Sequence, residues 1–452
     1  MSMKTRMKRQ GCWLVLALSG ALTGCAVYGH PGEANPGEAN PGEVGPGVAD
    51  PGEVDPGDKM QLQDWVRDSF DFAQKQYLDL IGRIGVDTDK IPRSTNPDGS
   101  LRLELPINQK GALGWTTGFF PGSLWYLYEY LARYGKGDEA KEMLKHAKAF
   151  TGKLAKVQDL TNDHDVGFVM YCSYGNGYRL TGDSTFEKIL LRTADSLVTR
   201  FNQKTGCTKS WDWWGDSKKD FPVIMDNMMN LELLYWASSE SKEPTYAAKA
   251  SSHASTTLKN HYRPDSSAYH LVNYDPETGA VKKRQNYQGY ADGSVWARGQ
   301  GWGLYGFTMS YRETGKMEYL EQAIRVANFL LGHKNLPEDM VPYWDFEDPR
   351  IPDVARDAST AAIYASALYE LCSYVGEADA RRFRNAADTI LKNLASSRYR
   401  EAELGKNNGF ILKHSVGSLN EKLMFEIDVP LNYADYYFLE ALTRKLKLEG
   451  KL

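Results

Sequence analysis

Cysteine is scarce in this chain of 452 residues, which contains only five. Cys172, Cys207 and Cys372 lie far apart, in neither a disulfide framework nor the close spacing of zinc ligands. We expect Cys172 and Cys372 to be small, buried, hydrophobic side chains. The scarcity argues against a disulfide-stabilised scaffold and against a cysteine-ligated metal module.

The sequence also lacks the short motifs that mark several large enzyme classes. It has no Gly-x-Ser-x-Gly elbow, no phosphate-binding P-loop and no dinucleotide fingerprint. Lysine and arginine (54) nearly balance aspartate and glutamate (58), and the body of the chain has no basic run. We therefore expect no nucleic-acid partner.

Long apolar runs are missing as well, apart from one near the N-terminus. Four cationic residues (Lys4, Arg6, Lys8, Arg9) precede an apolar stretch from Cys12 to Leu22, which is too short for a comfortable membrane span. The stretch ends in Leu22-Thr23-Gly24-Cys25, which resembles a bacterial lipobox. Residues 1–25 are therefore predicted to be a lipoprotein signal peptide, with Cys25 as the lipidated residue that anchors the mature chain to a membrane. The alternative is an ordinary secretory signal in which Cys25 is incidental.

Residues 26–59 are predicted to form an extended tether. Proline recurs at five-residue steps within a Pro-Gly-Glu/Val repeat (Pro31, Pro36, Pro41, Pro46, Pro51, Pro56), and such a segment has almost nothing to bury. Ala26 follows the cysteine without an acidic run. We therefore expect an exported lipoprotein on the periplasmic face of the outer membrane. Residues 60–452 would be the catalytic domain.

Helical periodicity dominates residues 60–452, where apolar residues recur at steps of three and four. About twelve helices are predicted near 60–82, 118–135, 138–156, 165–181, 183–203, 222–239, 243–262, 297–314, 316–334, 357–376, 378–397 and 430–448. Buried and half-exposed helices alternate, so six hairpins can close into an all-α (α/α)6 barrel. An open helical solenoid is the competing architecture, although its period is usually tighter and its loops shorter.

The joints and loops of this pattern carry further information. Four joints place glycine after a helix, where it can supply a left-handed cap (Gly135, Gly182, Gly315, Gly376). The long loops precede the buried helices and hold most of the tryptophan and proline. Loops that feed one end of an inner ring gather at one mouth, where we expect the site.

Residues 287–306 form the richest candidate segment for a binding site. Arg298 offers a planar, permanently charged fork suited to a carboxylate. The aromatic rings offer faces on which a sugar can stack, and six glycines allow the backbone to approach a ligand. The alternative is that the glycines and rings only allow buried helices to pack closely.

Two carboxyl groups are candidates for acid–base chemistry. Asp226 lies among Ile224, Met225, Met228 and Met229, and burial there would raise its pKa so that it holds a proton near neutral pH. Asp165 has the same interpretation. Each residue can instead simply begin a helix, where aspartate is common. His164-Asp165 also suggests a metal-dependent phosphohydrolase, but the further ligands are not found, so we expect no metal and no cofactor.

At these residues the chain resembles glycoside hydrolase family 88, the unsaturated glucuronyl hydrolases. The resemblance spans about residue 60 to the C-terminus. The motifs that carry it are Trp115-Thr-Thr-Gly-Phe-Phe-Pro-Gly, His164-Asp-Val-Gly-Phe, Asp226-Asn-Met-Met-Asn, His270, Gln288-Gly-Tyr-Ala-Asp and Trp296-Ala-Arg-Gly-Gln-Gly-Trp-Gly-Leu-Tyr. It implies an (α/α)6 barrel that acts on oligosaccharides with a 4,5-unsaturated uronic acid at the non-reducing end.

The resemblance also implies a reaction and a set of roles. A carboxylic acid protonates the vinyl ether at C4, water adds at C5, and the hemiketal rearranges to release the next sugar. Asp226 would be the acid and then the base that activates water, while Asp165 would orient the ring and stabilise positive charge. Substrate contacts would come from Trp115, His164, Trp211, His270, Gln288, Arg298 and Trp302.

Two positions depart from the family pattern and leave the fine substrate preference open. Tyr287 stands where some relatives have histidine, and Phe120 where tryptophan is frequent. Residues 413–418 would meet a sulfate or the next sugar, or would simply form a polar loop. The alternatives in function are an unsaturated rhamnogalacturonyl hydrolase and a non-catalytic glycan-binding lipoprotein. Nothing in the sequence indicates the oligomeric state.

Overall fold

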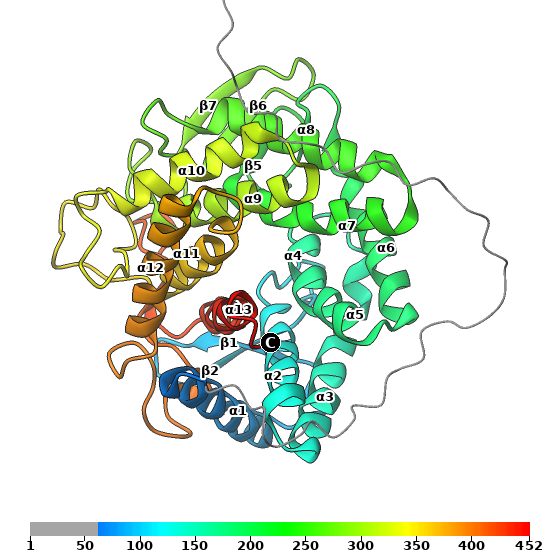
Figure 1. Cartoon of the computed structure of the whole chain (residues 1–452). Coiled ribbons are helices and arrows are strands. Elements are labelled where there is room, and N and C mark those ends of the chain that lie inside the picture. The colour runs from blue at the N-terminus through cyan, green and yellow to red at the C-terminus, as the bar shows by residue number, and fades with distance from the viewer. Residues whose placement is uncertain (1–61) are drawn as a thin grey trace, which may run out of the picture. The chain divides into compact units, whose positions relative to one another are not determined.

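The computed structural model describes residues 62–452, which form a double ring of helices (Figure 1). The inner ring consists of α2 (Phe119–Tyr134), α4 and α5 (Val166–Met170 and Asn176–Thr181, joined by a π-helical turn), α7 (Leu231–Ser241), α9 (Ala297–Thr314), α11 (Ala358–Leu371) and α13 (Asn432–Leu448). The outer ring consists of α1 (Asp64–Ile84), α3 (Gly137–Gly152), α6 (Ser184–Val198), α8 (Pro244–His261), α10 (Met317–Leu331) and α12 (Glu377–Leu394). The predicted (α/α)6 barrel is confirmed.

The ring closes because the last inner helix, α13, packs between α11 and α2 and also contacts the first outer helix, α1. The Tyr77 hydroxyl of α1 donates to the Asp435 carboxylate of α13 over 3.0 Å. Asp435 also accepts the backbone N–H groups of Ile411 and Leu412, at 2.9 and 2.8 Å. Closure therefore joins the two ends of the barrel sequence, which distinguishes it from an open solenoid.

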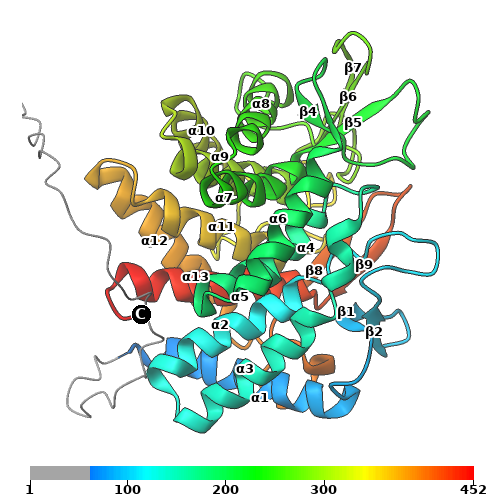
Figure 2. The same cartoon turned by 90° about the vertical axis from the view of Figure 1, so that its right-hand side faces the viewer.

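Short strands occupy the long loops and gather at the end of the barrel where the inner helices begin (Figure 2). They are β1 and β2 (Ile91–Thr95, Leu101–Glu104), β3 and β4 (Phe201–Asn202, Cys207–Thr208), β5, β6 and β7 (Phe221–Ile224, Leu271–Tyr274, Val281–Gln285), and β8 and β9 (Ser415–Ser418, Phe425–Val429). All pairings are antiparallel. This end is the mouth that the sequence predicts for the site.

Three details of the predicted pattern are wrong. The helix predicted near 222–239 begins as strand β5, continues as the 3₁₀ helix η4 (Met225–Asn230) and becomes α-helical only at Leu231. Val223 and Ile224 pair with β6, and that long-range pairing overrides the local pattern. Gly182 and Gly315 adopt left-handed caps, with φ of 63° and 65°, but Gly135 and Gly376 have negative φ and are not left-handed caps.

Other expectations about burial are confirmed. Cys172 and Cys372 are buried and unpaired, as is Cys207. Within residues 62–452, no helix combines the length and the apolar character that a membrane crossing requires.

Candidate active site

Strand pairing brings Asp226 and His270 together from positions 44 residues apart. Ile224 is paired with Leu271 in the antiparallel β5–β6 ladder, so the chain that leaves β5 runs past the residue that precedes β6. Met225 N–H donates to the His270 carbonyl at 2.9 Å. One residue further, Asp226 Oδ2 lies 3.0 Å from His270 Nε2. A sheet register thus fixes one carboxyl group of the site.

The prediction that burial holds a proton on Asp226 is wrong for this site. Burial pushes the pKa of Asp226 up, but the hydrogen bond from His270 and the positive charges of His270 and Arg298 outweigh it, so the pKa lies below its ordinary value. An ionised carboxylate only accepts hydrogen bonds, so His270 Nε2 is the donor. The sequence reveals the apolar neighbours of Asp226 but not the histidine 44 residues away.

Asp165 lies opposite, at the start of α4, and is held by Asn230 of η4. Asn230 Nδ2 donates to Asp165 Oδ1 at 3.1 Å, while Asn230 Oδ1 accepts the Phe168 N–H at 2.7 Å. Gly167 permits this close packing, because a Cβ there would lie 2.8 Å from Asn230 Oδ1. One amide therefore joins the two segments that carry the carboxyl groups.

The proton of this site belongs to Asp165 rather than to Asp226. Burial, and after it the negative charge of Asp226, raises the pKa of Asp165 to about 7. Burial also raises the pKa of the neighbouring Asp163 to about 6 and lowers the pKa of His164 to about 4. Near neutral pH the site thus holds an ionised carboxylate, a carboxyl that is about half protonated and a neutral imidazole. The two carboxyl groups are coupled and titrate as a pair.

A pocket of about 410 Å³ opens above the two carboxyl groups. Five predicted site residues line it: Trp115, Asp165, Trp211, Asp226 and Gln288. Trp211 stacks on Trp213, with ring centroids 4.8 Å apart and planes 26° apart, and Tyr287 lies 5.7 Å from Trp211. Leu423 and Phe425 of the β8–β9 hairpin form another part of the wall. Flat aromatic faces beside acidic groups suit a sugar ring.

The other four predicted residues are buried and do not line this pocket. His164 and His270 contact Asp165 and Asp226 respectively, with N–O distances of 3.5 and 3.0 Å. Trp302 is fully buried, with its ring 5.3 Å from that of Phe168. They surround the site without forming its surface.

Arg298 is occupied by the protein itself. It donates to the Asp357 carboxylate at 2.9 Å and to the carbonyl groups of Val416 and Gly417, each at 2.5 Å. Its guanidinium lies over the ring of Trp296, 4.7 Å from the centroid. In this structure the fork that the sequence suggested for a ligand carboxylate holds strand β8 in place.

Two glycines of α9 allow close packing, one against the segment that carries Asp226 and one against Tyr262. A Cβ at Gly306 would lie 2.5 Å from Met228 Cβ, and one at Gly303 would lie 2.3 Å from the Tyr262 hydroxyl. The packing interpretation of the 287–306 segment is therefore confirmed for these glycines. Gln288 is the part of the segment that reaches the pocket.

Several residues that matter here were missed by sequence reasoning. Asn230 belongs to one of the sequence motifs, and only the fold shows that it holds Asp165. Nothing in the sequence pattern distinguishes Asp163, although potential ligand atoms of Asp163, His164 and Asp165 lie within 4.8 Å of one another. Trp213 reaches the pocket from the loop between β4 and β5, and Phe425 reaches it from strand β9. The Trp211-Asp212-Trp213-Trp214 run was the one available signal. That the reaction needs no metal stays a prediction.

Known proteins are similar to this chain in both sequence and fold. The sequence profile of Glycosyl Hydrolase Family 88 matches residues 90–349. The chain belongs to this family. An unsaturated glucuronyl hydrolase of Formosa agariphila is 42% identical over 381 residues, covering 83% of this chain and 90% of the relative. One from Bacillus sp. strain GL1 is 36% identical, covering 79% and 91%. A crystal structure of an unsaturated glucuronyl hydrolase specific for heparin is 45% identical, with a TM-score of 0.79 over 86% of this chain and 98% of that chain.

Proposed function

We propose that this family 88 glycoside hydrolase removes the 4,5-unsaturated uronic acid from the non-reducing end of lyase-generated oligosaccharides. The observation that carries the proposal is the pair Asp165 and Asp226, which share one pocket and have pKa values displaced in opposite directions. Such a pair supplies both a proton and a negative charge at neutral pH. Relatives named unsaturated glucuronyl hydrolase support the substrate class.

The reaction requires one proton at C4 and one water at C5. Asp226 donates the proton and then activates the water, and Asp165 holds the shared proton in the free enzyme and stabilises the positive charge that develops at C5. For Asp226 to act as the acid, the proton of the pair must pass to it when substrate binds. The 3.0 Å hydrogen bond from His270 keeps the Asp226 carboxyl group in a fixed orientation.

A panel of lyase digests tests the proposal. Purified protein is incubated with heparin, chondroitin and rhamnogalacturonan fragments, and the absorbance of the conjugated double bond is followed. We expect loss of absorbance with the glucuronyl fragments, and faster loss with heparin fragments, because the heparin-specific relative is 45% identical. Exclusive turnover of rhamnogalacturonan fragments, or binding without turnover, would replace this proposal by one of the alternatives.

We further propose that the enzyme is a lipoprotein anchored through Cys25 and facing the periplasm. Cys25 and the tether of residues 26–59 lie outside the described residues, so the support is the sequence pattern alone. Fractionation of cells that express wild type or Cys25→Ser tests the anchor, and protease treatment of intact cells tests the face. Wild-type protein in the soluble fraction contradicts the first claim, and complete digestion from outside contradicts the second.

A further inference from the structure

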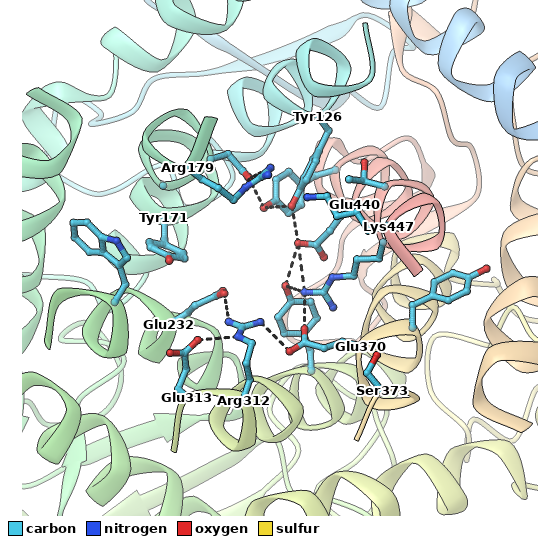
Figure 3. A pocket seen from close by; sticks show the side chains of 18 of the residues that line it. Tyr126, Tyr171, Arg179, Glu232, Arg312, Glu313, Glu370, Ser373, Glu440 and Lys447 are labelled. Carbon is cyan, nitrogen blue, oxygen red and sulfur yellow. Dashed lines mark hydrogen bonds and ion pairs between the residues drawn. The ribbon is translucent and has the colours of Figure 1, made fainter. Parts of the chain in front are cut away.

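A second and larger cavity lies among the inner helices and shares no lining residue with the catalytic pocket (Figure 3). Its volume is about 690 Å³, against about 410 Å³ for the catalytic pocket. It is lined by residues of the inner helices, several of them in the last turns of α9, α11 and α13, which bring charged side chains and aromatic rings around one central space (Figure 3).

Charged side chains of both signs alternate around this cavity. Arg312 pairs with Glu232, with Glu313 at 2.8 Å and with Glu370 at 2.9 Å. Arg444 pairs with Glu370 at 2.8 Å, and Glu440 accepts hydrogen bonds from Tyr126 and Tyr305 at 2.8 and 3.1 Å. The lining holds four cationic side chains (Arg179, Arg312, Arg444, Lys447) and four carboxylates (Glu232, Glu313, Glu370, Glu440).

Aromatic groups with spare hydrogen-bonding capacity occupy another side. Trp236 is partly exposed, with its ring 6.2 Å from that of Tyr171 and 5.6 Å from that of Tyr178. Tyr171 points into the cavity in Figure 3. Both residues line the cavity, and within residues 62–452 neither the Tyr171 hydroxyl nor the Trp236 indole N–H forms a hydrogen bond with another protein group.

This arrangement is more polar than closing the barrel requires. Buried ion pairs lose much of their attraction to desolvation, and well-packed apolar side chains of similar volume stabilise a core at least as well. Here the ion pairs border an open volume, so their donors and acceptors are positioned to meet a ligand.

We propose that this cavity binds a neutral saccharide of one or two rings. Paired arginine and glutamate groups donate to and accept from neighbouring hydroxyl groups, while Trp236 and Tyr171 offer faces to the C–H side of a sugar ring. Because the charged lining side chains already form ion pairs within the protein, an ion gains little from entering. The volume lies within the range of small-molecule sites. The site does not depend on the catalytic proposal, since it shares no lining residue with the catalytic pocket.

Binding of glucose and cellobiose to the full-length protein, followed by isothermal titration and ligand-observed NMR, tests this site. We expect saturable binding that weakens about tenfold in Glu232→Gln, which removes a charged hydrogen-bond acceptor but keeps the shape. Tyr171→Phe, which removes only a hydroxyl, gives a second, milder test. Trp211→Ala, at the catalytic pocket, is the matched control and leaves this binding unchanged.

Turnover of an unsaturated substrate separates the two sites. Glu232→Gln and Tyr171→Phe retain wild-type turnover if the second cavity acts independently. Absence of saturable binding up to about 50 mM, a concentration well above weak specific affinities, overturns the proposal. So does binding that is lost in Trp211→Ala and kept in both second-cavity variants.

Discussion

At the residue scale, the chemistry rests on how two similar carboxyl groups acquire different pKa values. Both aspartates keep 7% of their surface exposed, so burial alone does not distinguish them. Asp226 has His270 at 3.0 Å, whereas Asp165 accepts from a neutral amide at 3.1 Å and faces the negative charge of Asp226. The hydrogen-bonding partner of each aspartate, and not its degree of burial, decides which of the two carries the proton.

Asp226→Asn is expected to abolish most turnover while leaving the fold intact. The amide is nearly isosteric but cannot donate the proton to C4 or accept one from water, and a placed acid–base group contributes about 10²–10⁴-fold. Steady-state kinetics gives kcat, and circular dichroism with thermal unfolding confirms that the variant is folded. Retention of more than about a tenth of wild-type kcat would contradict the role of Asp226.

The pH dependence of kcat/KM is expected to show a fall as pH rises through about 7. The raised pKa of Asp165 means that the pair keeps its one proton below that pH and loses it above, and kcat/KM reports groups of the free enzyme. In Asp165→Asn, the fall in kcat/KM near pH 7 should no longer occur at that pH, and kcat should be lower than in the wild type. If kcat/KM still falls at the same pH in Asp165→Asn, the titration belongs to another group. A rise in KM alone makes Asp165 a binding residue.

At the scale of elements, close packing between α9 and η4 positions Asp226. Gly306→Ala is expected to cost about 1–3 kcal/mol of stability and to lower kcat/KM, because the added methyl forces Met228 and its segment to shift. Gly137→Ala is the matched control, since nothing lies within 4 Å of its added Cβ at the start of the exposed helix α3. Thermal unfolding and kinetics measure both variants. A Gly306→Ala enzyme as stable and active as wild type would refute this account of the glycine.

The loop between β4 and β5 extends the aromatic wall outward through Trp213, which is 62% exposed yet stacked on Trp211. Trp213→Ala is expected to raise KM for an unsaturated tetrasaccharide by about three- to tenfold and to leave kcat unchanged. The size of the effect is that of losing one stacking contact between the indole ring and a sugar. The KM for a disaccharide should change little. Met317→Ala, which truncates another exposed apolar side chain, controls for general effects. Equal effects on both substrates would show that Trp213 contacts only the first sugars.

At the scale of the whole molecule, periodicity was enough to predict the barrel, because each helix must bury a stripe of three- and four-residue spacing. Position along the chain did not reveal the β5–β6 register, which sets Asp226 against His270. Nor did it show that the Arg298 guanidinium would donate its hydrogen bonds to strand β8, since residues 298 and 417 are neighbours only in the folded state. Residue types and motifs therefore predicted the site, whereas its protonation and the residues that form its surface depend on long-range contacts.

The central claim concerns the whole reaction, and turnover in D₂O tests it most directly. Early products of an unsaturated disaccharide are analysed by NMR, with Asp226→Asn as the inactive control. The account predicts a single deuterium at C4 of the uronic acid product, on one face only, because a fixed carboxyl group delivers it. Release of a uronic acid that keeps its double bond, or deuterium spread over both faces of C4, would contradict enzymatic protonation at C4.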